Sequence, residues 1–391
     1  MALQSFAVLL SVLSFAHAAD ALAEDASMST LITTPLVIEG LTSDDQENLY
    51  TPGRTPGPGL ACPIWRTPLE APRLTIVGFI PAPSASAQCS PSGLAFGPGG
   101  MLYVAEGDRV FRFFPDPAQP PIAEVFANGV PGTNGLAFDR AGNLWTGDGT
   151  TGQGRIWRID PEGVATEMFR IQPLANLVNV SEGVGGVGRD IRTLPPGTVT
   201  VTASSRNAAN AAGSQSLVAN GLAFDRNGDL FIADTARGAI WRVHIHHNGG
   251  VAAAMGCDTT FTANTLCLEN IFVSHPLLEG IDGIALDVAG NVWAAANERN
   301  AVVYIRANGQ VREVFRNALD AVTQLRNEGP LEFPTSPVIV GHRFCTANSD
   351  GNRRDNSPST AGEIGGTGQP RGKISCLGER VTIRGMPLPI R

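Results

Sequence analysis

Residues 133–143 read TNGLAFDRAGN, and this stretch recurs along the chain. Residues 219–229 read ANGLAFDRNGD, residues 281–291 read IDGIALDVAGN, and a shorter copy, PSGLAF, lies at residues 91–96. In each copy an apolar stretch leads into a turn that contains glycine, and in each a second apolar stretch follows. This is the pattern of a β-hairpin. Four copies of one sequence motif indicate a repeat architecture.

Two more strands are predicted after each hairpin. Third strands are expected at residues 110–114, 156–159, 240–245 and 302–305, and fourth strands at residues 123–126 and 312–315. A four-stranded unit of about forty residues cannot bury both of its faces alone, so copies pack around an axis as blades. The sequence therefore predicts an all-β fold, a six-bladed β-propeller of four-stranded antiparallel blades.

The number of blades depends on one long interval in the repeat. Ser92 and Asn134 are 42 residues apart, whereas Asn134 and Asn220 are 86 apart, so a degenerate blade or a long insertion lies between Ile171 and Ala219. Six blades with one degenerate is the prediction, and five blades plus an insertion is the alternative. A further blade start is expected at residues 335–340, and residues 74–80 are expected to supply an outer strand that closes the ring.

The N-terminus resembles an export signal. Residues 6–15 are apolar and Ala16, His17 and Ala18 follow, which predicts a signal peptide over residues 1–18, although its first residues lack Lys or Arg. Residues 19–72 are expected to form a Pro/Gly-rich extended leader, and residues 73–391 the propeller domain. The expected location is secreted or periplasmic. No stretch is long enough to span a membrane.

Cysteine and charge content narrow the possible partners. The six cysteines form no CxxC pair, and an even number in an exported chain favours disulfides. Fifteen pairings are possible; we predict Cys62 with Cys89, Cys257 with Cys267, and Cys345 with Cys376. The net charge is −8 and Lys373 is the only lysine, which argues against a nucleic-acid partner.

The hairpin geometry brings polar side chains together. The start of a first strand and the end of the second lie at the same end of an antiparallel hairpin. The residues before the repeat glycines should therefore form a ring at one mouth of the channel: Ser92, Asn134, Asn220, Asp282 and Ser336. The second strands end nearby at Glu106, Asp148, Asp234, Asn297 and Asn348. Such oxygen donors suit Ca²⁺ better than zinc, although they can also simply cap strands and turns.

These repeats resemble the senescence-marker-protein, gluconolactonase and luciferin-regenerating-enzyme-like family of propellers, over about residues 73–391. The resemblance implies six blades, a divalent metal in the channel, and often lactone hydrolysis, with a Glu, two Asn and one Asp as ligands. By matching motif, Asn134, Asn220 and Asp282 fill the Asn, Asn and Asp places. Ser92 stands where the family has Glu, and Glu106 is predicted to substitute for it.

The predicted function is a secreted, divalent-metal-dependent hydrolase that acts on a small-molecule lactone or related ester. Asp282 would accept a proton from water, and His275, expected near the same mouth, would assist the proton transfer. His244, His246 and His247 are expected at the surface of the opposite end. The alternative is a noncatalytic NHL-type propeller that binds a ligand or a protein at this mouth.

Overall fold

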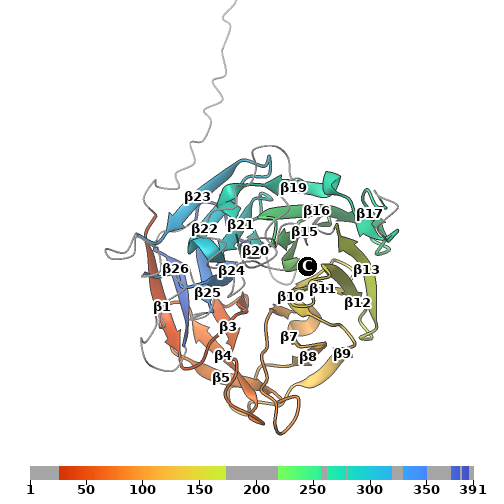
Figure 1. Ribbon diagram of the computed structural model, residues 1–391. Coiled ribbons are helices and arrows are strands. Elements are labelled where there is room, and N and C mark those ends of the chain that lie inside the picture. The colour runs from red at the N-terminus through yellow and green to blue at the C-terminus, as the bar shows by residue number, and fades with distance from the viewer. Residues whose placement is uncertain are drawn as a thin grey trace, which may run out of the picture.

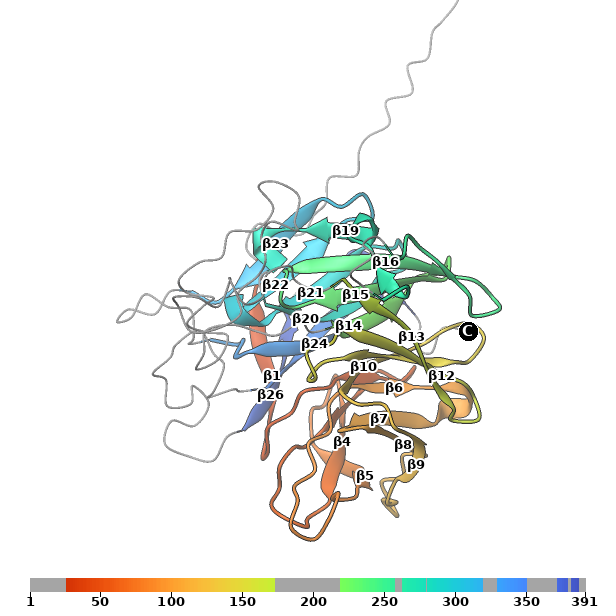
Figure 2. The same ribbon diagram turned by 45° about the vertical axis from the view of Figure 1, so that its right-hand side comes forward.

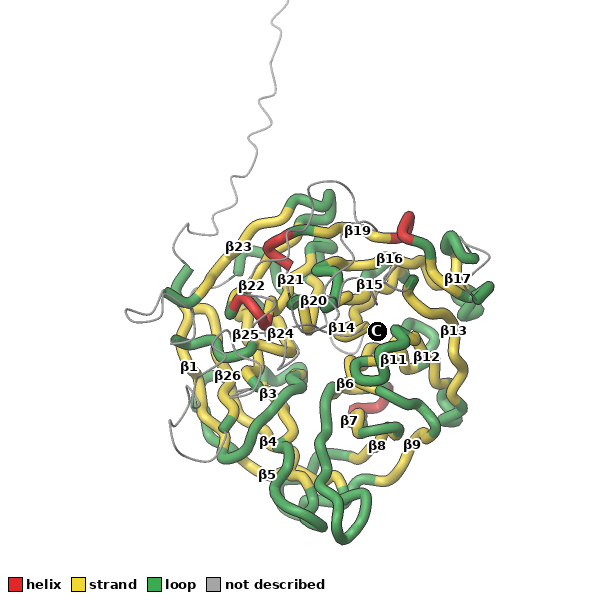
Figure 3. Tube along the Cα trace, in the orientation of Figure 1, coloured by secondary structure: helices red, strands yellow, loops and turns green. Residues whose placement is uncertain are grey.

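The computed structural model describes residues 26–172, 219–256, 262–278, 280–318, 329–349, 371–378 and 381–386. Strands dominate this part of the chain, and its helices are single 3-10 turns such as η5 (Asn297–Arg299) (Figure 3). The strands form six sheets arranged around one axis (Figure 1). This confirms the predicted all-β, six-bladed propeller.

Each blade has four antiparallel strands that run from the axis outward. Blade 1 contains β2 (Thr42–Ser43), β3 (Asn48–Pro52), β4 (Cys62–Pro68) and β5 (Thr75–Ile80). Blade 2 contains β6 (Leu94–Phe96), β7 (Leu102–Glu106), β8 (Arg109–Phe113) and β9 (Glu124–Asn128). Blade 3 contains β10 (Thr133–Phe138), β11 (Leu144–Asp148), β12 (Arg155–Ile159) and β13 (Ala165–Ile171), and β18 (Thr265–Leu266) adds to its edge in parallel.

The other three blades complete the ring. Blade 4 contains β14 (Ala219–Phe224), β15 (Asp229–Asp234) and β16 (Ala239–Ile245), with β17 (Val251–Ala252) and β19 (Ile271–Ser274) both paired to β16. Blade 5 contains β20 (Ile281–Leu286), β21 (Val292–Ala296), β22 (Ala301–Ile305) and β23 (Val311–Arg316). Blade 6 contains β24 (Pro334–Val340), β25 (Arg343–Asn348), β26 (Gly372–Leu377) and, as its outer strand, β1 (Met28–Thr34).

The six inner strands form a closed ring, because each of β2, β6, β10, β14, β20 and β24 contacts the next, and β24 contacts β2. Five of them, β6, β10, β14, β20 and β24, are labelled in Figure 2. The repeat glycines make this close approach possible. A Cβ on Gly135 would lie 2.6 Å from the Asn220 carbonyl oxygen, and one on Gly221 would lie 2.6 Å from the Gly283 Cα. Real Cβ atoms do not come that close to backbone, so these positions require glycine.

Replacing Gly221 by Ala is therefore expected to lower the free energy of unfolding by about 1–3 kcal/mol or more, because the added methyl forces two inner strands apart. Gly250→Ala is the matched control: its Cβ would meet side-chain atoms and no backbone, Asn248 Oδ1 at 3.0 Å and His246 Cδ2 at 3.7 Å. Urea unfolding of the two variants checks this. Equal stability of both would show that the inner strands are not packed as described.

The N-terminal part of the chain differs from the prediction. Residues 28–72, expected as an extended leader, supply β1 and the inner three strands of blade 1. β5 is the outer strand of its own blade, and the ring is closed instead by β1, which pairs with β26. Blade 1, from residues 42–80, thus completes the six. β10 of blade 3 contacts β14 of blade 4, so the predicted degenerate blade does not lie between them. The expected signal peptide and the long interval at residues 173–218 lie outside the described residues.

Two of the predicted disulfides are confirmed. Cys62 is bonded to Cys89, and Cys345 is bonded to Cys376. Cys267 is also disulfide-bonded, but its predicted partner Cys257 lies outside the described residues. Disulfides are typical of oxidising compartments, which is consistent with an extracellular or periplasmic protein. Within the described residues, no helix has the length and hydropathy needed to cross a membrane.

Candidate functional site

The strand register confirms that first-strand starts and second-strand ends share one mouth. Thr133 pairs with Asp148, and Ala219 pairs with Asp234. Blades 5 and 6 repeat the arrangement, because Ile281 pairs with Ala296 and Pro334 with Asn348. We call this end of the propeller the polar mouth.

The carboxylates that end the second strands belong to the scaffold. Asp148 accepts hydrogen bonds from the backbone N–H and hydroxyl of Thr151. Asp234 is fully buried and pairs with the equally buried Arg237 at 2.8 Å, and it also accepts a hydrogen bond from Trp241 Nε1. The carboxylate oxygens of Asp148 and Asp234 thus form hydrogen bonds and ion pairs within their own blades.

The ring residues lie on the innermost strands and are buried, with exposed fractions of 9% for Asn134, 7% for Asn220 and 6% for Asp282. In blades 4 and 5 the residue that follows the second strand contacts the ring residue. Asn220 Nδ2 lies 3.4 Å from Thr235 Oγ1, and Asn297 Nδ2 donates a hydrogen bond of 3.0 Å to Asp282 Oδ2.

Blade 1 adds a ring residue that the sequence analysis missed. Glu39 precedes Gly40, and a Cβ on Gly40 would clash with the Ser92 carbonyl, as the other repeat glycines would with the next inner strand. The Glu39 carbonyl accepts a hydrogen bond of 2.6 Å from Thr335 Oγ1 of blade 6. Glu39 therefore occupies the blade 1 position of the ring. The blade 6 position belongs to Thr335 and not to the predicted Ser336, because Pro334 pairs with Asn348 as Thr133 does with Asp148, and a Cβ on Gly283 would lie 2.4 Å from the Thr335 carbonyl oxygen. Its carboxylate pairs with Arg54.

Glu106 is held in a different way. Its Oε2 pairs with Arg109 at 3.2 Å, and its Oε1 lies 3.4 Å from the backbone nitrogen of Ser90. Since Glu106 ends a second strand, it lies behind the ring. Metal ligation by Glu106 stays a prediction, and Glu39 is the carboxylate that the inner strands place in the ring.

The ring residues fit a hard divalent cation. Glu39 and Asp282 offer carboxylate oxygens and Asn134 and Asn220 offer amide oxygens, which is the donor chemistry that Ca²⁺ takes. Beside Asp282, the Asn297 Oδ1 is buried and has no hydrogen-bond partner. An orphaned oxygen of this kind points to a missing partner. The described residues contain no group of three or more His, Cys, Asp or Glu that could hold a metal ion, so any metal here depends on the two amides.

His275 lies on the mouth side, as predicted, directly after β19. Its backbone N–H donates to the Gly238 carbonyl, and its Nδ1 accepts a hydrogen bond of 3.1 Å from the Leu277 N–H. Burial, together with the nearby Arg299, lowers the pKa of His275, which favours the neutral ring. Because Nδ1 is an acceptor, the ring proton of the neutral imidazole is on Nε2, which can donate a hydrogen bond.

Three other histidines, His244, His246 and His247, lie at the opposite end, as predicted. His244 pairs in register with Asp229, and its Nδ1 lies 2.7 Å from the Asp229 carboxylate. His244, His246 and His247 line a cavity of about 80 Å³ with residues of the turns at Asp139 and Asp225. They are thus remote from the polar mouth.

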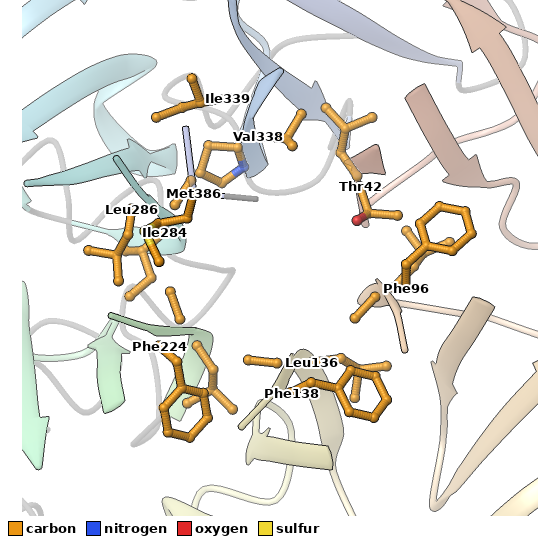
Figure 4. A pocket seen from close by; sticks show the side chains of 18 residues that line it. Thr42, Phe96, Leu136, Phe138, Phe224, Ile284, Leu286, Val338, Ile339 and Met386 are labelled. Atoms are coloured by element: carbon orange, nitrogen blue, oxygen red, sulfur yellow. The ribbon is translucent and has the colours of Figure 1, made fainter. Parts of the chain in front are cut away.

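The axial end opposite the polar mouth is apolar. A cavity of about 120 Å³ there is lined by inner-strand side chains that follow the repeat glycines, including Leu136, Phe138 and Phe224 (Figure 4). Met386, from the C-terminal segment, also lines it and is anchored by a backbone hydrogen bond to Leu286. The two ends of the propeller axis therefore differ: one is the polar mouth, and the other is lined by apolar side chains.

A six-bladed propeller with an oxygen-rich mouth defines a class of fold and site that several families share. Residues 185–329 match the sequence model of the SMP-30/gluconolactonase/LRE-like region, which confirms the resemblance predicted from the repeats. No curated protein matches the chain at a significant level.

Solved structures share this fold at low sequence identity. A calcium-binding protein, regucalcin, from Agrobacterium tumefaciens is 17% identical, with a TM-score of 0.56 over 93% of this chain and 97% of that one. A gluconolactonase from Xanthomonas campestris is 15% identical, with a TM-score of 0.52 over 90% of each chain. A PQQ-bound aldose sugar dehydrogenase from Streptomyces coelicolor is 17% identical, with a TM-score of 0.54 over 90% of this chain and 98% of that one. These likenesses show the fold, which hosts more than one chemistry.

Proposed function

We propose that the protein is a divalent-metal-dependent hydrolase of the gluconolactonase-like type, secreted or periplasmic, that acts on a lactone or a related ester. The observation that carries the proposal is the ring at the polar mouth, to which four blades contribute Glu39, Asn134, Asn220 and Asp282. The match of residues 185–329 to the gluconolactonase-like region supports the same reaction class.

The ring residues would hold the cation, and their oxygen donors favour Ca²⁺. A bound divalent cation supplies Lewis acidity to a carbonyl oxygen and acidifies water. Asp282 is the proton acceptor in this proposal, because it is the ring carboxylate on an inner strand whose Oδ2 is oriented by the Asn297 amide. His275, with its proton on Nε2, donates a hydrogen bond on the same side.

The test is a hydrolysis assay on purified protein with a panel of sugar, alkyl and aryl lactones and simple esters. The protein is first stripped with EDTA, and Ca²⁺, Mn²⁺ or Zn²⁺ is then added back. Hydrolysis that disappears on stripping and returns with one cation is the expected result. A protein that binds no cation and hydrolyses nothing in the panel would instead be a noncatalytic binding propeller.

A further inference from the structure

Each of the two carboxylates of the ring contacts a neighbouring side chain. Asp282 receives a hydrogen bond from the neutral Asn297 side chain. Glu39 instead forms an ion pair with Arg54, in which Arg54 Nη1 contacts Glu39 Oε2. The exposed side-chain fractions are 24% for Arg54 and 15% for Glu39, so this pair is only partly shielded from solvent.

Arg54 is held in this position by two blades. Its backbone N–H donates to the Val37 carbonyl at 2.8 Å, two residues before Glu39. From the blade 2 side, the Ser90 hydroxyl accepts hydrogen bonds from Arg54 Nε at 3.0 Å and from Nη2 at 2.7 Å. The guanidinium therefore stays against Glu39 because three separate contacts fix it, and its charge is a permanent part of the mouth, since arginine does not deprotonate in proteins.

The positive charge of Arg54 reduces the net negative charge that the ring presents to a cation. Glu39 and Asp282 together carry two negative charges, and Arg54 offsets one of them. The affinity of oxygen-ligand sites for Ca²⁺ depends on the number of ligand charges and on site rigidity. A cation that approaches Glu39 must also meet the repulsion of the guanidinium at a short distance, where interactions between charges are strong.

We propose that Arg54 is an internal counter-ion of Glu39 that keeps the affinity of the ring for divalent cations low. The proposal rests on the proposed function, because it takes the ring as the cation site. Arg54 is thus a residue that tunes binding and not a ligand. Removing its charge should strengthen cation binding, whereas a residue that merely orients Glu39 for a metal would weaken binding when removed.

The neighbouring blade offers a matched control. Arg109 pairs with Glu106 at the same mouth, with exposed fractions of 27% and 5%, close to those of the Arg54 pair. The experiment measures Ca²⁺ binding by isothermal titration calorimetry on EDTA-stripped full-length protein at fixed ionic strength, since salt screens exposed charges. The variants are Arg54→Gln, Arg54→Lys and Arg109→Gln, each checked for the wild-type far-UV spectrum and melting temperature.

Arg54→Gln is expected to bind Ca²⁺ roughly tenfold more tightly, while Arg54→Lys and Arg109→Gln stay within about twofold of wild type. Ser90→Ala, which loosens the guanidinium without removing it, is a second variant should Arg54→Gln fold poorly; it should tighten binding by a smaller factor. Unchanged or weaker binding by both Arg54→Gln and Ser90→Ala overturns the proposal, as does tightening by Arg109→Gln in place of Arg54→Gln. If the wild type binds Ca²⁺ or hydrolyses lactones in these cases, the proposed function stands and only the role of Arg54 fails. If no variant binds Ca²⁺ at millimolar concentration, both fail.

Discussion

Replacing Glu39 by Gln is expected to weaken divalent-cation binding by about a hundredfold, because the ring then loses one of its two anionic ligands. Glu106→Gln is expected to leave the affinity within about twofold of wild type, since that carboxylate lies behind the ring and pairs with Arg109. Calorimetric titration of the two stripped variants with Ca²⁺ measures the difference directly. The two substitutions remove the same charge from neighbouring blades, so net charge alone cannot separate them.

The comparison also decides between two assignments of the carboxylate. The motif match puts Ser92 where the family has glutamate, and Glu106 was predicted to substitute for it because it is expected nearby. The close approach of inner strands at Gly40 instead places Glu39 in the ring. A large loss of affinity in Glu106→Gln with none in Glu39→Gln would support the first assignment. Loss in neither variant would remove the metal site from the polar mouth.

The repeats were sufficient to predict the blade architecture and four blades almost strand by strand, because turn residues and apolar alternation are local signals. The aspartate of each turn shows why they are reliable. Asp139 accepts hydrogen bonds from the N–H groups of Ala141 and Asn143 and from Trp145 Nε1, and Asp287 repeats this pattern. The repeated sequence motif thus encodes a specific hydrogen-bonded turn.

Blade 1 has the same turn, but its sequence lacks the glycine that marks the turns of the other repeats. Asp44 accepts hydrogen bonds from the N–H groups of Gln46 and Asn48 and from the Tyr50 hydroxyl. The residue before Asn48 has a φ of 60°, in the left-handed region, and it is Glu47, whereas the turn at Asp139 has Gly142 at this position. Without the glycine, residues 44–50 did not register as a repeat, and Glu39 was therefore not recognised as a ring residue.

Long-range closure was the part that local patterns could not supply. The pairing of β1 with β26 joins residues at opposite ends of the chain, for example Thr34 with Gly372. No residue pattern within β1 or β26 specifies this pairing. The pairing follows from the closure of the whole ring of blades. A strand predicted only from its own residues can therefore be placed in the wrong blade, as happened with residues 74–80.

Replacing Asp282 by Asn should leave the fold intact and reduce lactone turnover by about a hundredfold to ten-thousandfold, the range that a general base contributes. Asn has the same shape and keeps one ligating oxygen, but it loses the charge and the capacity to accept a proton. The Asn297 amide that orients Asp282 Oδ2 can still meet an oxygen of the new side chain. The measurements are kcat on the best lactone of the panel, cation content and the free energy of unfolding.

Asp287→Asn is the matched control, because Asp287 lies five residues further along the chain, in the turn at the opposite end of β20. Its carboxylate is fully buried and accepts hydrogen bonds from the Asn291 side chain and from two backbone N–H groups. This variant should lose stability, by about 1–3 kcal/mol, and keep turnover per folded molecule. The assignment of Asp282 is contradicted if its Asn variant retains wild-type turnover and cation content, or if the two variants lose activity equally at equal folded fraction.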